Sequence, residues 1–407
     1  MNSDFMNLSR NLRNESLLKT ESLFVAQKTE WLALFAENFL SVCTEIVRQQ
    51  RESSLPPISR MEYIMLNTNF INRRYIAEVW VFGKDRYIDK KQRMVGEYDV
   101  SFLFVYFDEM WGKLLSSRKR YLGNVKAREV TSFILESFSD FYSYLISIAR
   151  FAIVECVDNK PFIDIAKDEL FKINVGDYMA ETETVYEENK NKNADDLTKW
   201  FNERLSYKYN YGDYSGLDFS GKEFMNTDFR YAMFRRAVLN RVNFNNSSLI
   251  GANFRFAEME GCQLDNCFMF EADFSNANMK NASFKKATAK VGLIDENEWS
   301  FVGFLPASFR NADLTSANFT QSKLTGADFT GAILSNADFT GAILTGADFT
   351  KANLSNANFT VAISSGANFT DANLTGVDFT SAVLLDADFT NAILDDAIFD
   401  GCIRVKL

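Results

Sequence analysis

Large apolar residues recur every five positions over the C-terminal half of the chain. They run from Phe219 to Phe284 and again from Phe304 to Phe399, and a small residue, usually alanine, stands two positions before most of them. A period of five fits neither an α-helix nor a flat strand, because their side chains repeat every 3.6 and 2 residues. It fits a coil in which the large and the small residue point inward and three positions face water. The pattern therefore predicts a solenoid with a continuous stacked core.

The repeats use the same few residue types in the same order. The stretch between Ala327 and Thr350 reads ADFTGAILSNADFTGAILTGADFT, and it resembles the pentapeptide-repeat family, whose pattern is A(D/N)LXX. Tandem copies in this number are typical of a repeat architecture. The resemblance implies a right-handed quadrilateral β-helix with one repeat per side. Residues twenty apart would then stack in one column at about 4.8 Å.

The order of the large residues supports a square section independently of the resemblance. From Phe309 to Phe399 they alternate between Phe and Leu. On four sides, this alternation places Phe on two opposite sides and Leu on the other two, so that like stacks on like and the core is well filled. Ser364 breaks the alternation, and a tolerated defect with a small void is the expected result.

The repeat is lost between residues 287 and 303, and the phase of the Phe residues slips by one repeat across this stretch. A loop that leaves the coil and consumes an odd number of sides would restore the stacking. The resemblance implies that such loops contribute to function in family members that protect topoisomerases. An irregular coil of normal length is the alternative. The candidate contacts in the loop are Asp295, Glu296, Glu298 and Trp299.

The N-terminal part follows a different pattern. Helical spacing with short strand-like runs predicts an α-rich α+β domain over residues 1–180. A linker and a capping helix are expected over residues 181–214, with the polar run 181–192 as linker and residues 195–214 covering the first coil of the solenoid at 215–407. A simple linker is the alternative. The expected helices cover residues 15–52, 98–115, 130–157 and 162–171, and the expected strands cover 62–67 and 75–82.

Two columns on the outside of the predicted coil are acidic. Between residues 310 and 400, eleven acidic residues outnumber three basic ones, which gives a net charge of −8. The resemblance implies a use for this charge, because quinolone-resistance members of the family mimic DNA and bind DNA gyrase and topoisomerase IV. Alternatively, aspartate simply suits this position of the repeat. The columns contain Asp328, Asp348 and Asp388 on one side and Asp338 and Asp378 on the opposite side.

A third column is apolar although it occupies a water-facing position. Such a strip is unusual on a monomer, so it predicts a partner surface, with a twofold homodimer as one candidate. The β-propensity of Ile and Val is the alternative explanation. The expected interface residues are Ile343, Ile363, Val383, Leu385 and Ile403.

Composition narrows the chemistry. The net charge is −10, which disfavours direct binding to nucleic acid. Histidine, the commonest general base and metal ligand, is absent, and we expect no cofactor or metal. An odd number of scattered cysteines, five in all, suits the reducing cytoplasm, and no apolar run is long enough to predict a membrane span. The first coils are expected to be basic, with a solvated charged face as the ordinary interpretation, because they contain Arg230, Arg235, Arg236, Arg241 and Arg255.

These patterns favour a non-enzymatic scaffold protein whose acidic β-helix presents flat faces to a protein partner. A DNA mimic that protects a type II topoisomerase is the specific form of this hypothesis. The alternative is a defence or effector protein in which the N-terminal domain acts and the solenoid positions or oligomerises it. An enzyme in the N-terminal domain would need carboxylates, lysine or tyrosine for acid–base chemistry, and no motif there indicates a nucleophile with its base.

Overall fold

The computed structural model describes residues 3–83, 93–121, 124–177, 182–192, 197, 209–289 and 305–403. These residues divide into two compact units, one within residues 3–191 and one within residues 192–403.

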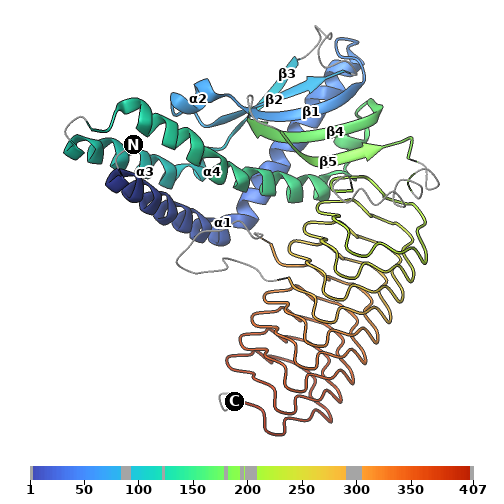
Figure 1. The fold of residues 1–407 in the computed structure, drawn as a ribbon. Coiled ribbons are helices and arrows are strands. Elements are labelled where there is room, and N and C mark those ends of the chain that lie inside the picture. Colours follow the sequence, from blue (N-terminus) through green and yellow to red (C-terminus); the bar gives the residue numbers. More distant parts are fainter. Residues whose placement is uncertain are drawn as a thin grey trace. The chain divides into compact units, whose positions relative to one another are not determined.

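The N-terminal unit combines helices with one sheet (Figure 1). Its helices are α1 (Ser3–Arg51), α2 (Asn67–Ile71), α3 (Val105–Arg118), α4 (Ala127–Cys156) and α5 (Lys160–Ile163), with short 3-10 turns η1 (Ser101–Leu103) and η2 (Lys119–Tyr121). Its strands are β1 (Ile58–Met65), β2 (Ile76–Phe82), β3 (Arg93–Asp99), β4 (Lys167–Asp177) and β5 (Glu183–Asn189).

The sheet is mixed and has the strand order β3-β2-β1-β4-β5. The β1–β4 pair is parallel, and the other three neighbouring pairs are antiparallel. The alternating buried residues of β2, Ala77, Val79 and Val81, follow the period of a half-buried strand. The helices α1 and α4 pack against each other and against strands of this sheet. The expected α-rich α+β domain is therefore confirmed.

Most of the expected helices and strands are present, with shifted bounds. The helix expected at residues 15–52 begins at Ser3, because Phe5 already contributes to the core. The helix expected at 130–157 is α4, and the strands expected at 62–67 and 75–82 are β1 and β2.

Three expectations for this unit are wrong in whole or in part, and β-bulges contribute to two of them. The helix expected at residues 98–115 forms as α3, but only from Val105 onward, because residues 98 and 99 end β3; the polar run 181–192, expected as a linker, contains the edge strand β5. The register of each strand shifts opposite its neighbour, so that Val95 and Tyr98 in β3, and Val185 and Tyr186 in β5, are buried without strict alternation. Because a bulge breaks the period of two, neither segment carries a clear strand pattern.

The third error is the helix expected at residues 162–171. The helix α5 ends at Ile163, and β4 begins at Lys167. Phe162 and Ile165 are both buried, but this helical spacing lasts for a single turn. From Phe171 onward the buried residues of β4 include every second position, as in a strand.

The C-terminal unit is a right-handed quadrilateral β-helix, as expected (Figure 1). The residue just before each large one faces water. An isolated parallel bridge joins it to the equivalent residue of the next coil, for example Asp328 to Asp348. The N–H of each large residue donates to a carbonyl of the next coil, as Phe329 does to Asp348 at 2.7 Å. Backbone hydrogen bonds therefore run along the axis and bind coil to coil.

The corners of the coil explain a second feature of the repeat. The second residue after each large one has a positive φ, for example +68° at Gly331 and +60° at Asn336. Glycine and asparagine adopt this left-handed conformation most readily. The turn at each corner therefore favours the Gly and Asn that are frequent at this position.

Phe rings stack along the axis in the core. The ring centroids of Phe329 and Phe349 lie 4.8 Å apart, with an interplanar angle of 3°. This contact confirms that residues twenty apart are neighbours. Ser364 is fully buried within the Leu column, and its hydroxyl has no hydrogen-bond partner among the described residues.

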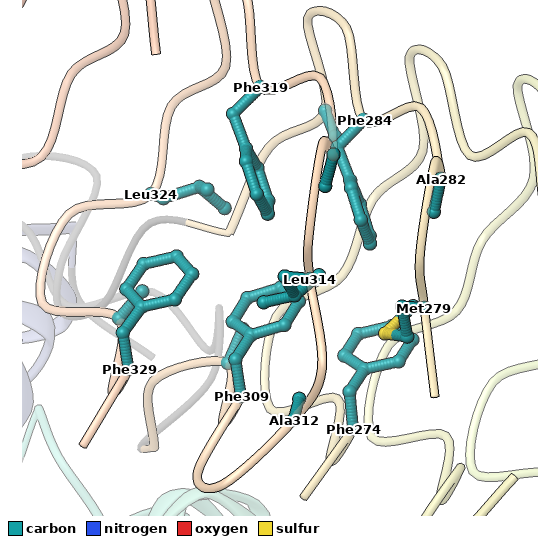
Figure 2. Close-up of a cluster of buried hydrophobic side chains, with 14 of the residues drawn as sticks. Phe274, Met279, Ala282, Phe284, Phe309, Ala312, Leu314, Phe319, Leu324 and Phe329 are labelled. Atoms are coloured by element: carbon teal, nitrogen blue, oxygen red, sulfur yellow. The ribbon is translucent and has the colours of Figure 1, made fainter. Parts of the chain in front are cut away.

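The stacking continues across the interruption in the repeat. Phe274 stacks on Phe309 at 5.1 Å, and Phe284 stacks on Phe319 at 4.7 Å (Figure 2). These partners are 35 residues apart, so the chain gains fifteen residues, or three sides, between two coils. The expectation that an odd number of sides restores Phe stacking is confirmed. The coil itself extends further than expected, because Ala287 is buried and Thr288 pairs with Lys323.

Candidate functional site

The last coils present four faces of different chemistry, each named here by the residues just before the large ones. The first acidic face carries Asp328, Asp348, Asn368 and Asp388, and the second carries Asn318, Asp338, Asn358 and Asp378. Because they occupy alternate sides, the two acidic faces lie on opposite sides of the coil. The apolar face carries Ile343, Ile363, Val383 and Ile403. The mixed face, opposite the apolar one, carries Asp313, Ile333, Asn353, Asn373 and Ile393.

The structure brings the predicted acidic residues into columns. On the first acidic face, Asp328 pairs with Asp348, and Asn368 separates Asp348 from Asp388. On the second, Asn358 stands between Asp338 and Asp378. Neighbouring carboxylates repel by about 1 kcal/mol at 4 Å in water. Except between Asp328 and Asp348, an asparagine doubles the distance between charges, which lowers the cost of the columns in stability.

Each aspartate also builds the local turn. The Oδ1 atom of Asp338 accepts hydrogen bonds from the N–H of Thr340 at 2.9 Å and from its hydroxyl at 2.5 Å. Asn358 accepts the same two bonds from Thr360 at 2.9 and 2.6 Å. Asp and Asn are therefore interchangeable as turn formers, and only the charge distinguishes them.

Hydrogen bonds stabilise the ionised form at the C-terminal end of the first acidic face. The hydroxyl and N–H of Thr390 hold the pKa of Asp388 below its usual value. At the other end of this face, Arg310 donates to Asp328 at 2.9 Å. The charge of this face is therefore least compensated near Asp348 and Asp388.

The apolar column lies on the surface as expected. Ile363, Leu385 and Ile403 have 39%, 40% and 56% of their surface exposed, and Ile343 and Val383 are half-buried. The structure adds Val361, which lies at a corner of this face and is 52% exposed. The mixed face carries two further exposed residues in the corresponding position, Ile333 and Ile393. The signal for them was present in the sequence, because both precede a large residue.

The predicted loop contacts Asp295, Glu296, Glu298 and Trp299 lie outside the described residues. The capping segment is described only in part. Tyr209 and Tyr214 are buried in the core of the first coils, and Leu197 packs against that core.

The first coils carry an aromatic residue among the arginines that sequence reasoning did not single out. Phe256 is 40% exposed and has a φ of +60°, which is uncommon for a bulky residue. The guanidinium groups of Arg235, Arg236 and Arg255 lie 6.0, 5.5 and 6.0 Å from its ring centre. The arrangement is a cation–π cluster on a corner of the coil.

Cysteine and metal chemistry are not indicated in the part of the chain that the structure describes. Cys262 and Cys267 replace alanine on the inside of the coil, and burial raises the pKa of each thiol to about 12. The described residues contain no group of three or more cysteine, aspartate or glutamate side chains that could hold a metal ion. Among the helices that the structure describes, none combines the length and apolar character of a membrane span.

Comparison with known proteins agrees with this architecture. The family model "Pentapeptide repeats" matches residues 215–246, 232–269, 247–285, 307–331, 322–360 and 365–403. No curated protein matches the chain.

Several solved structures are similar to the repeat region. HetL, a pentapeptide-repeat protein involved in regulating heterocyst differentiation in Nostoc sp. strain PCC 7120, is 25% identical, with a TM-score of 0.25, over 52% of this chain and 97% of HetL. QnrB1, a plasmid-mediated fluoroquinolone resistance protein, is 20% identical, with a TM-score of 0.32, over 48% of this chain and 90% of QnrB1. A pentapeptide-repeat protein from the Arabidopsis thaliana thylakoid lumen is 25% identical, with a TM-score of 0.11, over 37% of this chain and 67% of that protein.

Proposed function

Because residues 215–289 and 305–403 form a pentapeptide-repeat β-helix, we propose that this domain is a non-catalytic binding platform for a protein whose own ligand is DNA. Its two acidic faces are the binding surfaces. The proposal is carried by one observation, the alignment of carboxylates in straight columns on opposite sides of a rigid rod.

The charge density supports this proposal quantitatively. Residues 310–400 wind through about four and a half coils, or about 22 Å at about 4.8 Å per coil. Their net charge of −8 therefore amounts to about one negative charge per 2.7 Å of axis. Duplex DNA carries about one per 1.7 Å. This density applies to the whole segment, because five of its eleven acidic residues lie in the acidic columns and the other six lie elsewhere on the coils.

A type II topoisomerase, DNA gyrase or topoisomerase IV, is the specific partner that we propose. Such an enzyme binds duplex DNA along an extended basic surface, and the rod offers charge on two sides. Occupying that surface would compete with DNA and protect the enzyme from a drug that acts on its DNA complex.

Supercoiling by purified gyrase in the presence of a fluoroquinolone tests the proposal. We expect the protein to restore supercoiling, and a variant with Asp338, Asp348, Asp378 and Asp388 changed to Asn to lose most of this effect. Because Asn already forms the same turn in these columns, the variant should remain folded, which circular dichroism can check.

The matched control changes four acidic residues outside the acidic columns, Asp371, Asp386, Asp395 and Asp396, to Asn. It removes the same charge, so we expect it to protect nearly as well as the wild type if the columns are the surface. Equal loss in both variants would show a general charge effect and contradict the assignment to the acidic faces. No protection by the wild-type protein would remove the topoisomerase as the partner.

A further inference from the structure

We propose that the first coils of the β-helix bind a short acidic segment of a partner protein. The binding surface, here called the arginine patch, consists of Arg235, Arg236, Arg241, Arg255 and Phe256. This inference is independent of the proposed function, because the acidic faces lie in later coils and carry the opposite charge.

The first coils are positively charged although the chain as a whole is acidic. Residues 215–257 contain six basic and three acidic side chains, a net charge of +3, whereas the whole chain has a net charge of −10. One of the three acids, Asp228, accepts a hydrogen bond from Arg230 at 2.7 Å and is neutralised by it. Among the residues that the structure describes, no carboxylate forms an ion pair with Arg236 or Arg241, and both side chains are exposed. The surplus positive charge is therefore accessible at these two residues.

Three residues of the patch stand at corners of the coil, where the fold favours other residue types. Arg236, Arg241 and Phe256 have φ angles of +56°, +60° and +60°. Glycine and asparagine adopt this conformation most readily, and they occupy most of the other corners, for example Asn246 and Gly261. Phe256 is in addition 40% exposed. Since the fold does not require these three residues, the cost of placing them at corners indicates a role at the surface.

The ring of Phe256 brings three guanidinium groups together. Those of Arg235, Arg236 and Arg255 lie 6.0, 5.5 and 6.0 Å from its centre, within the range of a cation–π contact. At the next corner, Cγ of Arg241 lies 3.5 Å from the place that a Cβ atom at Gly261 would occupy, so this side chain follows the corner toward the next coil. Arginine side chains that are already held in place lose less conformational freedom when they bind a ligand.

Carboxylates fit this arrangement. A planar guanidinium group donates two parallel hydrogen bonds to a carboxylate, which makes the pair strong and directional. Arginine and aromatic residues are also enriched among the residues that contribute most to binding at protein interfaces. The exposed part of the Phe256 ring adds an apolar contact among the charges. A peptide in which acidic residues flank an apolar side chain therefore matches the patch.

Acidic side chains border the patch and limit the length of the ligand. Glu258 and Glu260 are exposed on the coil that follows Arg241. Beside Arg255, a carboxylate oxygen of Asp273 lies 3.8 Å from a guanidinium nitrogen. A nucleic acid carries a charge at every phosphate, so its backbone would pass over these carboxylates and be repelled. A peptide with a few acidic residues at one point avoids this repulsion, and the patch therefore fits an acidic peptide better than a nucleic acid.

Selection from a random peptide library displayed on phage tests this inference without presupposing a peptide sequence. The full chain is the target, and a triple variant with Arg236→Asn, Arg241→Asn and Phe256→Asn is used for counter-selection. Asparagine already forms corners such as Asn246, so the variant should fold, and its thermal midpoint should equal or exceed that of the wild type. We expect the enriched peptides to carry clusters of Asp and Glu next to an aromatic or aliphatic residue.

Fluorescence polarisation with the most enriched peptide locates the contact. We expect Arg236→Asn to raise the dissociation constant about tenfold and Phe256→Asn to raise it about fivefold. The matched control combines Lys286→Asn with Lys351→Asn, which removes two positive charges from corners outside the patch. This control should leave the dissociation constant within about twofold of the wild-type value.

Several results would overturn the inference. One is a selection that yields no peptide dependent on the patch, or peptides without an excess of acidic residues. Another is an equal loss of affinity in the lysine control, which would show a general charge effect. A lower thermal midpoint of the triple variant would show that the three residues serve the fold. A single-stranded oligothymidylate that competes for the patch more strongly than the peptide would assign it to nucleic acid instead.

Discussion

At the scale of single residues, each aspartate of the acidic columns both forms a local turn and places a negative charge on the surface. Asp338 closes a local turn through Oδ1, and Asn358, one coil later, closes the same turn without a charge. The fold therefore does not require the charge, which is what makes Asp-to-Asn substitution a clean test of function. Inside the coil, by contrast, the fold depends on the size and shape of the side chain. Ser364 departs from this requirement, because it stands in a column of Leu residues.

Ser364→Leu should stabilise the β-helix. Ser364 lies where Leu344 and Leu384 stand in the neighbouring coils, and its buried hydroxyl has no partner among the described residues. Filling the space and removing the hydroxyl should raise the free energy of unfolding by about 1–3 kcal/mol. Urea denaturation measures the change. Ser364→Ala, which removes the hydroxyl without filling the space, should give a smaller gain, and a loss of stability with leucine would show that no void exists.

At the scale of elements, the sequence predicted the β-helix far better than the N-terminal domain. One repeat is one side of the coil, so the spacing of Phe and Leu determines the register, the square section and the fifteen additional residues between Phe274 and Phe309. In the N-terminal domain, bulges at Val95 and Val185 break the alternation that identifies a strand. The strands β3 and β5 are defined by hydrogen bonds to β2 and β4. A pattern within the strand's own residues does not contain this information.

The acidic and apolar columns were also predictable from the repeat, because they follow from stacking at a known interval. The turn chemistry beneath the aspartates and the arginine cluster around Phe256 were not, because they depend on side-chain contacts at the corners. The arginines were visible in the sequence, but their common aromatic neighbour was not.

The loss of stability caused by a deletion in the coil should depend more on whether the register of stacking is kept than on the number of residues removed. Removing residues 326–345, one full coil, leaves every Phe stacked on Phe and should lower the thermal midpoint only modestly. Removing residues 346–350, a single side, places Phe329 against Leu354 and Leu334 against Phe359, so that one whole interface between coils is mismatched. We expect the shorter deletion to be the more destabilising one, because mismatched side chains leave voids and strain in the core. Thermal unfolding measures both, and a larger loss for the full-coil deletion would contradict this expectation.

At the scale of the whole molecule, the described residues form two units that are held together by different patterns of contacts. The N-terminal unit has a mixed sheet and packed helices, whereas each coil of the C-terminal unit contacts mainly its neighbours. The acidic and apolar faces belong to the second unit alone. Both proposals for binding depend on the same premise, that each fifth residue turns one corner of a square coil.

Pyrene fluorescence tests this premise most directly. In protein with Cys402→Ser, pyrene attached at Asn358→Cys and Asp378→Cys should give excimer emission, because these positions pair in adjacent coils. Pyrene at Asn358→Cys and Asn368→Cys should give monomer emission only, because these positions lie on opposite faces. Dilution with unlabelled protein excludes contact between molecules. Excimer emission from the second pair, or from neither, would contradict the square coil and the faces derived from it.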